Sequence, residues 1–382
     1  MKIKFAKPKV DTKVLKVIKN VINSGIFVHG EFTKKFEDNL EKYFNKKNKI
    51  ISTSSCTAAM HLFYLSIGLK KGDEVIVSAQ THVATAHAVE ICGAKPVFVD
   101  CELNTGNISI NEIEKKVTKK TKCIAVTHFL GKPANMIEII KIAKKHKLKI
   151  LEDTALSIGS KIKNKFSGTF GDAGAFSFHP VKIITTGEGG ALILKNKKYY
   201  NHCKSVRSFG YDVSDPNKRK IPGNYDVNKL GLNYRISEIE SIIGISQLKD
   251  IEKKILIRSQ NYNFLLKSLK NIKYLKILNS SSNKDYKSSY YSMNIILKSK
   301  SREYRNKFII KLKELGIQSS IYYPHPVPLL KYYKNKYKYK KKEFPNASRI
   351  AYNSFSLPVG PHIKKKDIIY MIKSIKNILN TK

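Results

Sequence analysis

The sequence of 382 residues has no run of 18 or more uncharged apolar residues, the length that a membrane-spanning helix requires. Its first residues, MKIKFAKPKVDTK, carry charges with no long apolar stretch behind them, unlike a secretory signal. A hydrophobic content of 42% is nevertheless typical of a folded globular protein. We therefore expect no membrane partner, and a chain of this length predicts two domains of unequal size.

Cysteine is scarce, and its spacing excludes two further classes of protein. The five cysteines lie far apart, without a CxxC pair, at Cys56, Cys92, Cys101, Cys123 and Cys203. An odd number of scattered cysteines indicates reduced thiols, as in a cytoplasmic protein, rather than a disulfide framework. The same spacing predicts no zinc site, and we expect no metal.

Acidic residues are few: 29 Asp and Glu stand against 72 Lys and Arg, which gives a net charge of +43. Such a charge raises the alternative of a nucleic-acid-binding protein, because Lys and Arg neutralise phosphates. However, the lysines are spread over almost every segment, and arginine, the usual reader of bases, is scarce. We therefore expect no nucleic-acid partner, and a surface whose field attracts anionic ligands.

Strands and helices alternate through the first half of the chain. Strands are predicted at 73–78, 95–100, 123–128 and 149–152, and helices at 83–92, 110–117 and 136–145. Short connections between them predict an α/β fold with a mostly parallel sheet covered on both faces. Ligands of such sheets bind at the carboxyl ends of the strands. Four candidates follow strands there: residues 55–57, His82, Asp153 and Lys182.

Lys182 is the strongest chemical candidate. It follows a small, apolar and aromatic strand at 173–178 and precedes a glycine-rich run at 187–190. Burial favours the neutral amine, the form that attacks a carbonyl to give a Schiff base. The alternative is an ordinary surface lysine. A second candidate is the loop 53–57, because a helix starting at Ala58 would offer its N–H groups to a phosphate. Its alternative is a simple helix cap.

Two strings carry a resemblance to a known family. Residues 176–182 (FSFHPVK) followed by 186–190 (TGEGG) resemble the lysine motif for pyridoxal 5'-phosphate (PLP) in nucleotide-sugar aminotransferases of the DegT/DnrJ/StrS type. Residues 231–238 (GLNYRISE) are similar to a second string of that family, and the resemblance covers nearly the whole chain. It implies a fold type I PLP-dependent aminotransferase: a large PLP-binding α/β domain at 1–250 and a smaller C-terminal α+β domain at 251–382.

The resemblance also implies roles for the candidates. Lys182 would bind PLP as a Schiff base and move the proton during catalysis, and Asp153 would hold the protonated ring nitrogen. His82 would stack on the ring, where relatives carry an aromatic residue. The phosphate ligands would be Cys56 through its N–H, Thr57, Ser177 and Asn233. Asn233 would reach the cofactor of a partner subunit, which implies a homodimer with a shared active site.

The sequence departs from the family at two places. Leu156 stands where relatives commonly carry Gln, Glu or His facing the cofactor, and Ser157 replaces that group only if the register allows it. Residues 322–326 (YYPHP) resemble a family region near the sugar, but the histidine lies one place early. Tyr322 and His325 are therefore predicted substrate contacts on weaker grounds.

We interpret the chain as an enzyme that moves an amino group from L-glutamate to a nucleotide-linked keto-deoxy sugar for surface-glycan or polysaccharide biosynthesis. One alternative is a PLP-dependent nucleotide-sugar dehydratase, but such relatives carry histidine where Lys182 stands. Others are a keto-cyclitol aminotransferase and a basic nucleic-acid-binding regulator, for which the chain has no further domain.

The remaining elements are predicted from local patterns alone. Amphipathic helices are expected at 12–23, ending at Gly25, and at 32–44, and a polar loop at 210–228. The C-terminal part predicts strands at 290–296 and 317–322 and helices at 302–315 and 367–379. The Tyr- and Lys-rich stretch 331–342 is expected to be an exposed, insertion-like segment.

Overall fold

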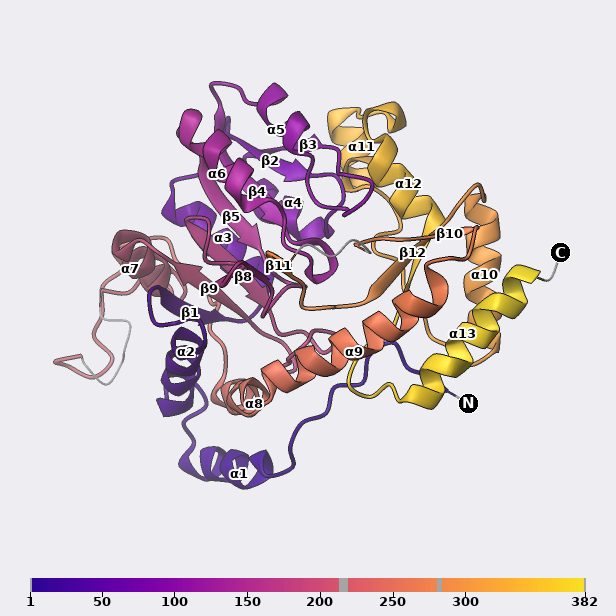
Figure 1. Cartoon of the computed structure of the whole chain (residues 1–382). Helices are drawn as coiled ribbons and strands as arrows, with labels where there is room; N and C mark the ends of the chain where they lie inside the picture. The colour runs from indigo at the N-terminus through magenta and orange to yellow at the C-terminus, as the bar shows by residue number, and fades with distance from the viewer. Residues whose placement is uncertain (1, 213–218, 280–283, 381–382) are drawn as a thin grey trace.

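A computed structural model describes residues 2–212, 219–279 and 284–380 of the chain. Its centre is a seven-stranded sheet in the order β1-β9-β8-β5-β4-β2-β3 (Figure 1). The strands are β1 (Lys49–Thr53), β9 (Gly190–Leu194), β8 (Ala173–Ser177), β5 (Lys149–Asp153), β4 (Thr121–Thr127), β2 (Glu74–Ser78) and β3 (Lys95–Val99). Within this sheet, six strands run in one direction, and β9 runs antiparallel to them, between β1 and β8. The predicted α/β class with a mostly parallel sheet is confirmed.

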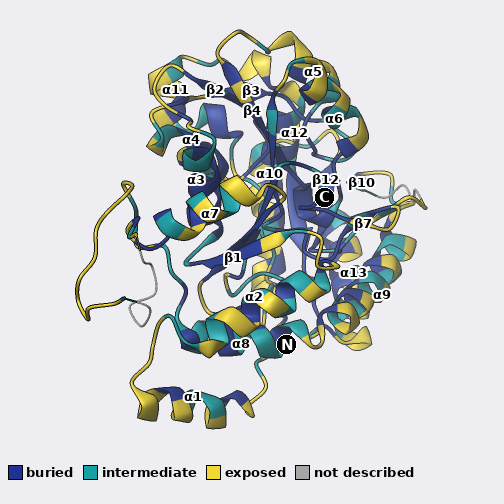
Figure 2. Cartoon of the chain, turned by 90° about the vertical axis from the view of Figure 1, so that its left-hand side faces the viewer, coloured by how far each residue is buried: buried dark blue, intermediate teal, exposed yellow. Residues whose placement is uncertain are grey.

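Alternate residues of each strand enter cores on opposite faces of the sheet. Val75 and Val77 pack in a core with α3 (Cys56–Ser66) and α4 (Val83–Ile91). Ile76 packs in another with α5 (Ile110–Lys115) and α6 (Met136–Lys145). Figure 2 shows the strands as buried and the outer helix faces as exposed. Both faces are therefore covered, as the alternation of strands and helices predicted.

The C-terminal part has a sheet of its own, in the order β10-β12-β13. These strands are β10 (Leu275–Ile277), β12 (Met293–Leu297) and β13 (Ser354–Leu357), with α9 (Ile251–Leu269), α10 (Arg302–Glu314) and α13 (Lys365–Asn380) packed against them. The predicted strand at 317–322 is wrong. Ile317 and Ser320 form only single-residue bridges, to Ile3 and Ser356, so no ladder develops there.

The two predicted N-terminal helices are present as α1 (Val14–Ser24) and α2 (Glu31–Tyr43). Gly25 ends α1 with a left-handed φ of 67°, as predicted. The buried carboxylate of Glu238 accepts hydrogen bonds from Phe32 N and Thr33 N, at 2.7 and 3.0 Å. Glu238 begins α8 (Glu238–Leu248), so it joins that helix to the amino end of α2.

Residues 331–342 were expected to be an exposed, insertion-like segment; most of them are exposed, but part of the stretch packs against α4. They contain α11 (Lys331–Tyr337), and α12 (Pro345–Asn353) follows them. Tyr333 is fully buried, and its hydroxyl lies 2.8 Å from Nδ1 of His87 on α4. Tyr337 donates a hydrogen bond to Glu90 of the same helix. Tyr333 packs inwards, and Tyr337 and Tyr339 are half-buried, while Tyr332 and the lysines stay at the surface. Composition alone does not reveal this division.

The domain boundary at residue 250 stays a prediction. It falls between α8 and α9, yet Ile3 lies in the core of the C-terminal sheet. In addition, β11 (Tyr286–Lys287) pairs with β6 (Lys161–Ile162), which in turn pairs with β7 (Lys165–Phe166). Residues 213–218 of the predicted loop 210–228 lie outside the described residues. None of the described helices is long and apolar enough to cross a membrane.

Candidate active site

The carboxyl ends of the parallel strands bring most of the predicted site residues together. The charge of Asp153, the last residue of β5, acts on the amine of Lys182, and so does the Cys56 group at the start of α3 if it ionises. Asp153 and Lys182 also act on the ring of His82, which follows β2. Ser177 is the last residue of β8 and pairs with Gly190 of β9 at the same edge. These residues therefore form one cluster at the carboxyl ends of the strands, as their positions in the sequence predicted.

Lys182 is held by a compact loop between β8 and β9. Its N–H donates to His179 O at 2.9 Å, and Thr186 N donates to Phe178 O at 3.0 Å. The Thr185 hydroxyl donates to Phe178 O at 2.9 Å and accepts from Gly187 N at 3.0 Å. These bonds explain the threonines and glycines that follow the lysine in the motif.

The surroundings of Lys182 suit a reactive amine. The side chain is half-buried, and loss of water around the amine lowers its pKa, which the negative charges of Asp153 and Glu188 partly oppose. A lysine with a lowered pKa supplies more of its neutral, nucleophilic form near neutral pH. Burial also raises the pKa of the Cys56 thiol well above its usual value, so this cysteine stays a thiol.

The amino end of α3 forms a cradle beside this loop. The helix begins at Cys56, two residues earlier than predicted, and the Ser55 hydroxyl caps it by accepting from Ala58 N at 3.1 Å. Cys56 and Thr57 therefore lie in the first turn, where N–H groups have no partner within the helix. A Cβ added at Gly190 would lie 2.6 Å from Cys56 N, so only glycine allows β9 to approach this closely.

Asp153 is buried, at 3% exposure, and firmly oriented. Oδ2 accepts from the Thr85 hydroxyl at 2.7 Å, and Oδ1 accepts from Ala155 N at 3.0 Å. The Thr81 hydroxyl lies 2.8 Å from that of Thr85 and 2.7 Å from that of Thr127. The carboxylate is thus fixed at the end of β5 by one hydroxyl group and one backbone N–H group.

Glu152, the other half of the predicted carboxylate pair, points away from this cluster. It is fully buried and accepts from three backbone N–H groups, of Gly168, Phe170 and Gly171, at 2.6–2.7 Å. Nε2 of His128 lies 2.9 Å away. Since Nδ1 of His128 accepts from Ala134 N at 3.0 Å, Nε2 carries the hydrogen that donates to Glu152. Glu152 therefore braces the loop around residues 168–171.

We predict that Glu152→Gln destabilises the protein by about 3–5 kcal/mol, because an amide cannot accept all of these bonds in a buried place. Burial opposes ionisation of Glu152, but His128 and the N–H groups of Gly171 and Gly168 hold its pKa below the usual value. Its contribution is therefore complete above the unfolded pKa of about 4.3 and is lost as the pH falls through the folded pKa.

Urea unfolding of both proteins at a series of pH values measures this effect. Glu138→Gln is the matched control, because Glu138 is an exposed carboxylate that pairs with Lys141 on the surface of α6. We expect that control to cost less than about 1 kcal/mol. A cost equally small for Glu152→Gln would contradict the bracing role.

Aromatic residues from the C-terminal part close the site. The ring of Tyr323 lies 5.6 Å from that of His82, edge to face, and the charge of Asp153 reaches it. The hydroxyl of Tyr322 lies 2.8 Å from that of Tyr291, and Gln80 Nε2 donates to Tyr322 O at 2.8 Å. The predicted contact Tyr322 therefore lies on the wall of the site.

Two predicted residues make their contacts elsewhere. Nε2 of His325 lies 3.3 Å from Arg302 of α10, and its ring packs edge to face on Tyr352 of α12. Asn233 is exposed, and its Oδ1 accepts from Arg235 Nε at 3.0 Å. Among the described residues, neither His325 nor Asn233 makes a hydrogen bond or ring contact with Lys182. Their proposed roles stay predictions.

At residue 156, where the sequence departs from the family, the side chain is apolar. Leu156 is buried, and its carbonyl accepts from the Ser289 hydroxyl at 3.2 Å. Ser157 is also buried, and its hydroxyl has no hydrogen-bond partner among the described residues. Whether Ser157 replaces the polar group of relatives stays a prediction.

Sequence reasoning missed three residues of the site: Thr85, Tyr291 and Arg258. Thr85 had a local signal, since it lies in the first turn of a helix that follows a strand end. Arg258 donates from Nη1 to Tyr291 O at 2.8 Å, and Tyr291 lies next to the Lys182 amine. No local pattern marks this pair, because both come from the C-terminal part, more than 70 residues after Lys182 in the chain.

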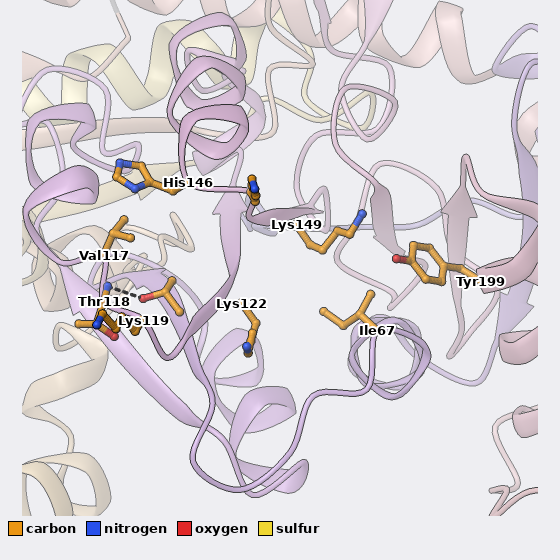
Figure 3. A pocket seen from close by; sticks show the side chains of 10 residues that line it. Ile67, Val117, Thr118, Lys119, Lys122, His146, Lys149 and Tyr199 are labelled. Atoms are coloured by element: carbon orange, nitrogen blue, oxygen red, sulfur yellow. Dashed lines mark hydrogen bonds between the residues drawn. The ribbon is translucent and has the colours of Figure 1, made fainter.

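A pocket of about 760 Å³ lies at the other end of the strands, beside the amino ends of β4 and β5 (Figure 3). Its lining includes Lys119, Lys122, Lys147, Lys149 and Tyr199. Lys149 pairs with Asp172 at 3.1 Å, and Lys122 Nζ lies 4.0 Å from Asp73. This pocket is separate from the cluster around Lys182 and contains none of its residues.

The chain is similar to known proteins in both sequence and fold. Residues 8–376 match the DegT/DnrJ/EryC1/StrS aminotransferase family. GDP-perosamine synthase from Escherichia coli O157:H7 is 33% identical, over 92% of each chain. GDP-4-keto-6-deoxy-D-mannose 3-dehydratase from Escherichia coli O55:H7 is 32% identical, over 79% of this chain and 81% of the relative. Streptococcus pneumoniae Spr1654, solved in a PLP form, superposes with a TM-score of 0.91 at 25% identity, over 99% and 98% of the chains.

Proposed function

Because the chain belongs to the DegT/DnrJ/EryC1/StrS aminotransferase family, we propose that it uses PLP to transfer an amino group from L-glutamate to a nucleotide-linked keto-deoxy sugar. The product would serve surface-glycan or polysaccharide biosynthesis. One observation carries this proposal: the amine of Lys182, with its lowered pKa, lies beside the fixed carboxylate of Asp153 and near the amino end of α3.

The residues present fit PLP. The cofactor has an aldehyde, a basic ring nitrogen and a phosphate, and the site offers a partner for each. Lys182 supplies the amine, and Asp153 the anion for a protonated ring nitrogen. The first-turn N–H groups of Cys56 and Thr57 and the hydroxyl of Ser177 suit a phosphate, and Gly190 leaves room at this cradle.

When bound, PLP supplies an electron-accepting ring that makes the Cα proton of an amino acid acidic. This chain's own groups do the rest. Lys182 would take that proton as a base from the carbon that loses nitrogen and, as an acid, deliver a proton to the carbon that receives it. Asp153 keeps the ring nitrogen protonated, and the Thr85 hydroxyl holds Asp153 in place. His82 and Tyr323 bound the site on the side of α4.

A sugar 3-dehydratase is the second candidate, favoured by a 32% identity to the Escherichia coli dehydratase. Both reactions use a nucleotide-linked keto sugar, so overall similarity does not separate them. The residue at position 182 would separate them, since the resemblance implies histidine at that place in such dehydratases. A lysine amine favours transamination, because it binds the cofactor covalently between the half-reactions.

The experiment uses purified protein with PLP, excess L-glutamate and a GDP- or UDP-linked 4-keto-6-deoxy sugar. We expect L-glutamate to abolish the near-visible absorption band of covalently bound PLP, and the keto sugar to restore it. Mass spectrometry should then detect an amino sugar nucleotide. A deoxygenated product without nitrogen supports the dehydratase instead. An absorption band that no amino acid changes rejects the aminotransferase.

A homodimer completes the proposal. The loop 25–31 and residues 231–238 lie together, since Glu238 N donates to Phe27 O at 2.9 Å and Arg235 Nη1 lies 3.1 Å from His29. Apolar side chains are exposed nearby, with Phe27 at 45% and Leu230 at 92%. Such side chains on a surface that also presents Asn233 support an interface between two copies.

We predict a particle of twice the chain mass in sedimentation experiments, and its dissociation in Leu230→Asp. A charge at the centre of an apolar interface is left without a partner when two copies meet. Ile310→Asp is the control, because Ile310 is also exposed, at 54%, but lies on α10. Monomeric wild-type protein, or equal dissociation of both variants, would reject this interface.

A further inference from the structure

The wall of the site next to Lys182 is built around Tyr291. This residue lies just before β12, is only 3% exposed, and places its hydroxyl 2.8 Å from that of Tyr322. The two rings are 5.6 Å apart and nearly perpendicular, at 87°. Buried Arg258 of α9 donates to Tyr291 O at 2.8 Å. The ring is therefore fixed at its hydroxyl end and through its backbone.

The amine of Lys182 lies against the face of this ring, with Nζ 5.8 Å from the ring centroid. An aromatic face attracts an ammonium ion within about 6 Å, most strongly where water is excluded. Burial raises the pKa of Tyr291 well above its usual value, so its hydroxyl stays neutral and adds no charge. The attraction therefore comes from the ring alone.

Four other titratable groups act on this amine or lie beside it. Asp153 ends β5, the Cys56 thiol begins α3, and Glu188 belongs to the same loop as Lys182. The fourth, His82, caps α4. Asp153 is already engaged by Thr85 and Ala155. A carboxylate in direct contact would hold the ammonium far more tightly than an aromatic ring does. The ring instead adds a weaker attraction that acts on the charged amine.

We propose that Tyr291 is a positioning residue for Lys182: its fixed ring attracts the charged amine and holds it in the cluster that contains Asp153. The inference deepens the proposed function, because it concerns the amine that the reaction uses. It names a residue of the C-terminal part as a determinant of the chemistry at the end of β8.

Competitive acetylation of the apoprotein tests this without cofactor or substrate. Trace acetic anhydride is applied at pH 6–11, and mass spectrometry of the Lys182 peptide gives the pH midpoint of this one amine. Tyr291→Met removes the ring while filling similar space. We expect its Lys182 midpoint to fall by about half a pH unit, the loss of a modest cation–π attraction. Tyr291→Phe keeps the ring and should keep the wild-type midpoint.

Lys254 of α9 is the internal control in every sample. Burial lowers its pKa to about 8, but it donates to Gln247 and should not change in any variant. A shift of both lysines would indicate a general loss of structure, and Tyr291→Leu then supplies a second ring-free protein. An unchanged or raised Lys182 midpoint in the folded ring-free variants overturns the proposal. So does a shift in Tyr291→Phe equal to that in Tyr291→Met.

These outcomes are independent of the proposed function. If the wild-type enzyme fails to transaminate but the Tyr291 variants shift Lys182 as expected, the positioning role stands and the reaction must be reassigned. If transamination is found and the midpoint does not move, the reaction stands and the positioning role is rejected.

Discussion

Lys182→Ala is expected to lose covalent PLP attachment completely and to lower transaminase activity by about a thousandfold or more. The substitution removes both the amine that bonds to the aldehyde and the group that moves the proton, and proton transfer alone contributes about 10²–10⁴-fold. Absorption spectroscopy after removal of free PLP measures the first loss, and amino-sugar formation with L-glutamate measures the second. Unchanged thermal unfolding would assign both losses to the chemistry, since Lys182 is only half-buried.

Lys254→Ala is the matched control for this variant. Lys254 is also half-buried, and burial lowers its pKa to about 8, so it resembles a reactive lysine by that criterion alone. However, it lies on α9 and donates to the backbone and side chain of Gln247. We expect it to be dispensable for PLP attachment. Attachment that survives in Lys182→Ala and fails in Lys254→Ala would locate the active site elsewhere.

The features that sequence predicted correctly have local causes. The helix expected at 136–145 has these bounds in the structure, because apolar periodicity and the Asn135 cap are properties of neighbouring residues. The strand ends that carry Asp153 and Ser177 were also evident, since short apolar runs between turns define them. Parallel pairing then places their carboxyl ends at one edge of the sheet, so Asp153 and Lys182 were expected together.

The features that sequence missed depend on contacts between distant segments. Tyr333 lies in a lysine-rich run, and only its contact with His87 of α4 explains why it is buried. Tyr291 had no local signal either, since its neighbour Lys182 lies more than 100 residues earlier. The contacts of His325 with Arg302 and Tyr352 also had no local signal, and its role at the substrate stays a prediction. Periodicity does not identify the element that packs against a given side chain.

Asp153→Asn is expected to lower transaminase activity by roughly ten- to a hundredfold, while thermal stability changes little. A hydrogen bond to a charged group contributes about 1.5–3 kcal/mol, and each 1.36 kcal/mol of barrier is tenfold in rate. The amide keeps one acceptor for Ala155 N–H, and its NH₂ group then faces the Thr85 hydroxyl. Thr85 can turn its own hydrogen towards Thr81, whose hydroxyl lies 2.8 Å away, so no buried donor is left unpaired.

Thr85→Val separates the charge of Asp153 from its orientation. It removes the hydroxyl that donates to Asp153 but leaves the carboxylate, so we expect a smaller fall in activity than in Asp153→Asn. The absorption of bound PLP gives a second comparison, because only the loss of the negative charge should favour an unprotonated ring nitrogen. Equal effects of the two substitutions on activity and on the spectrum would show that orientation alone matters. The charge of Asp153 would then have no role of its own in the reaction.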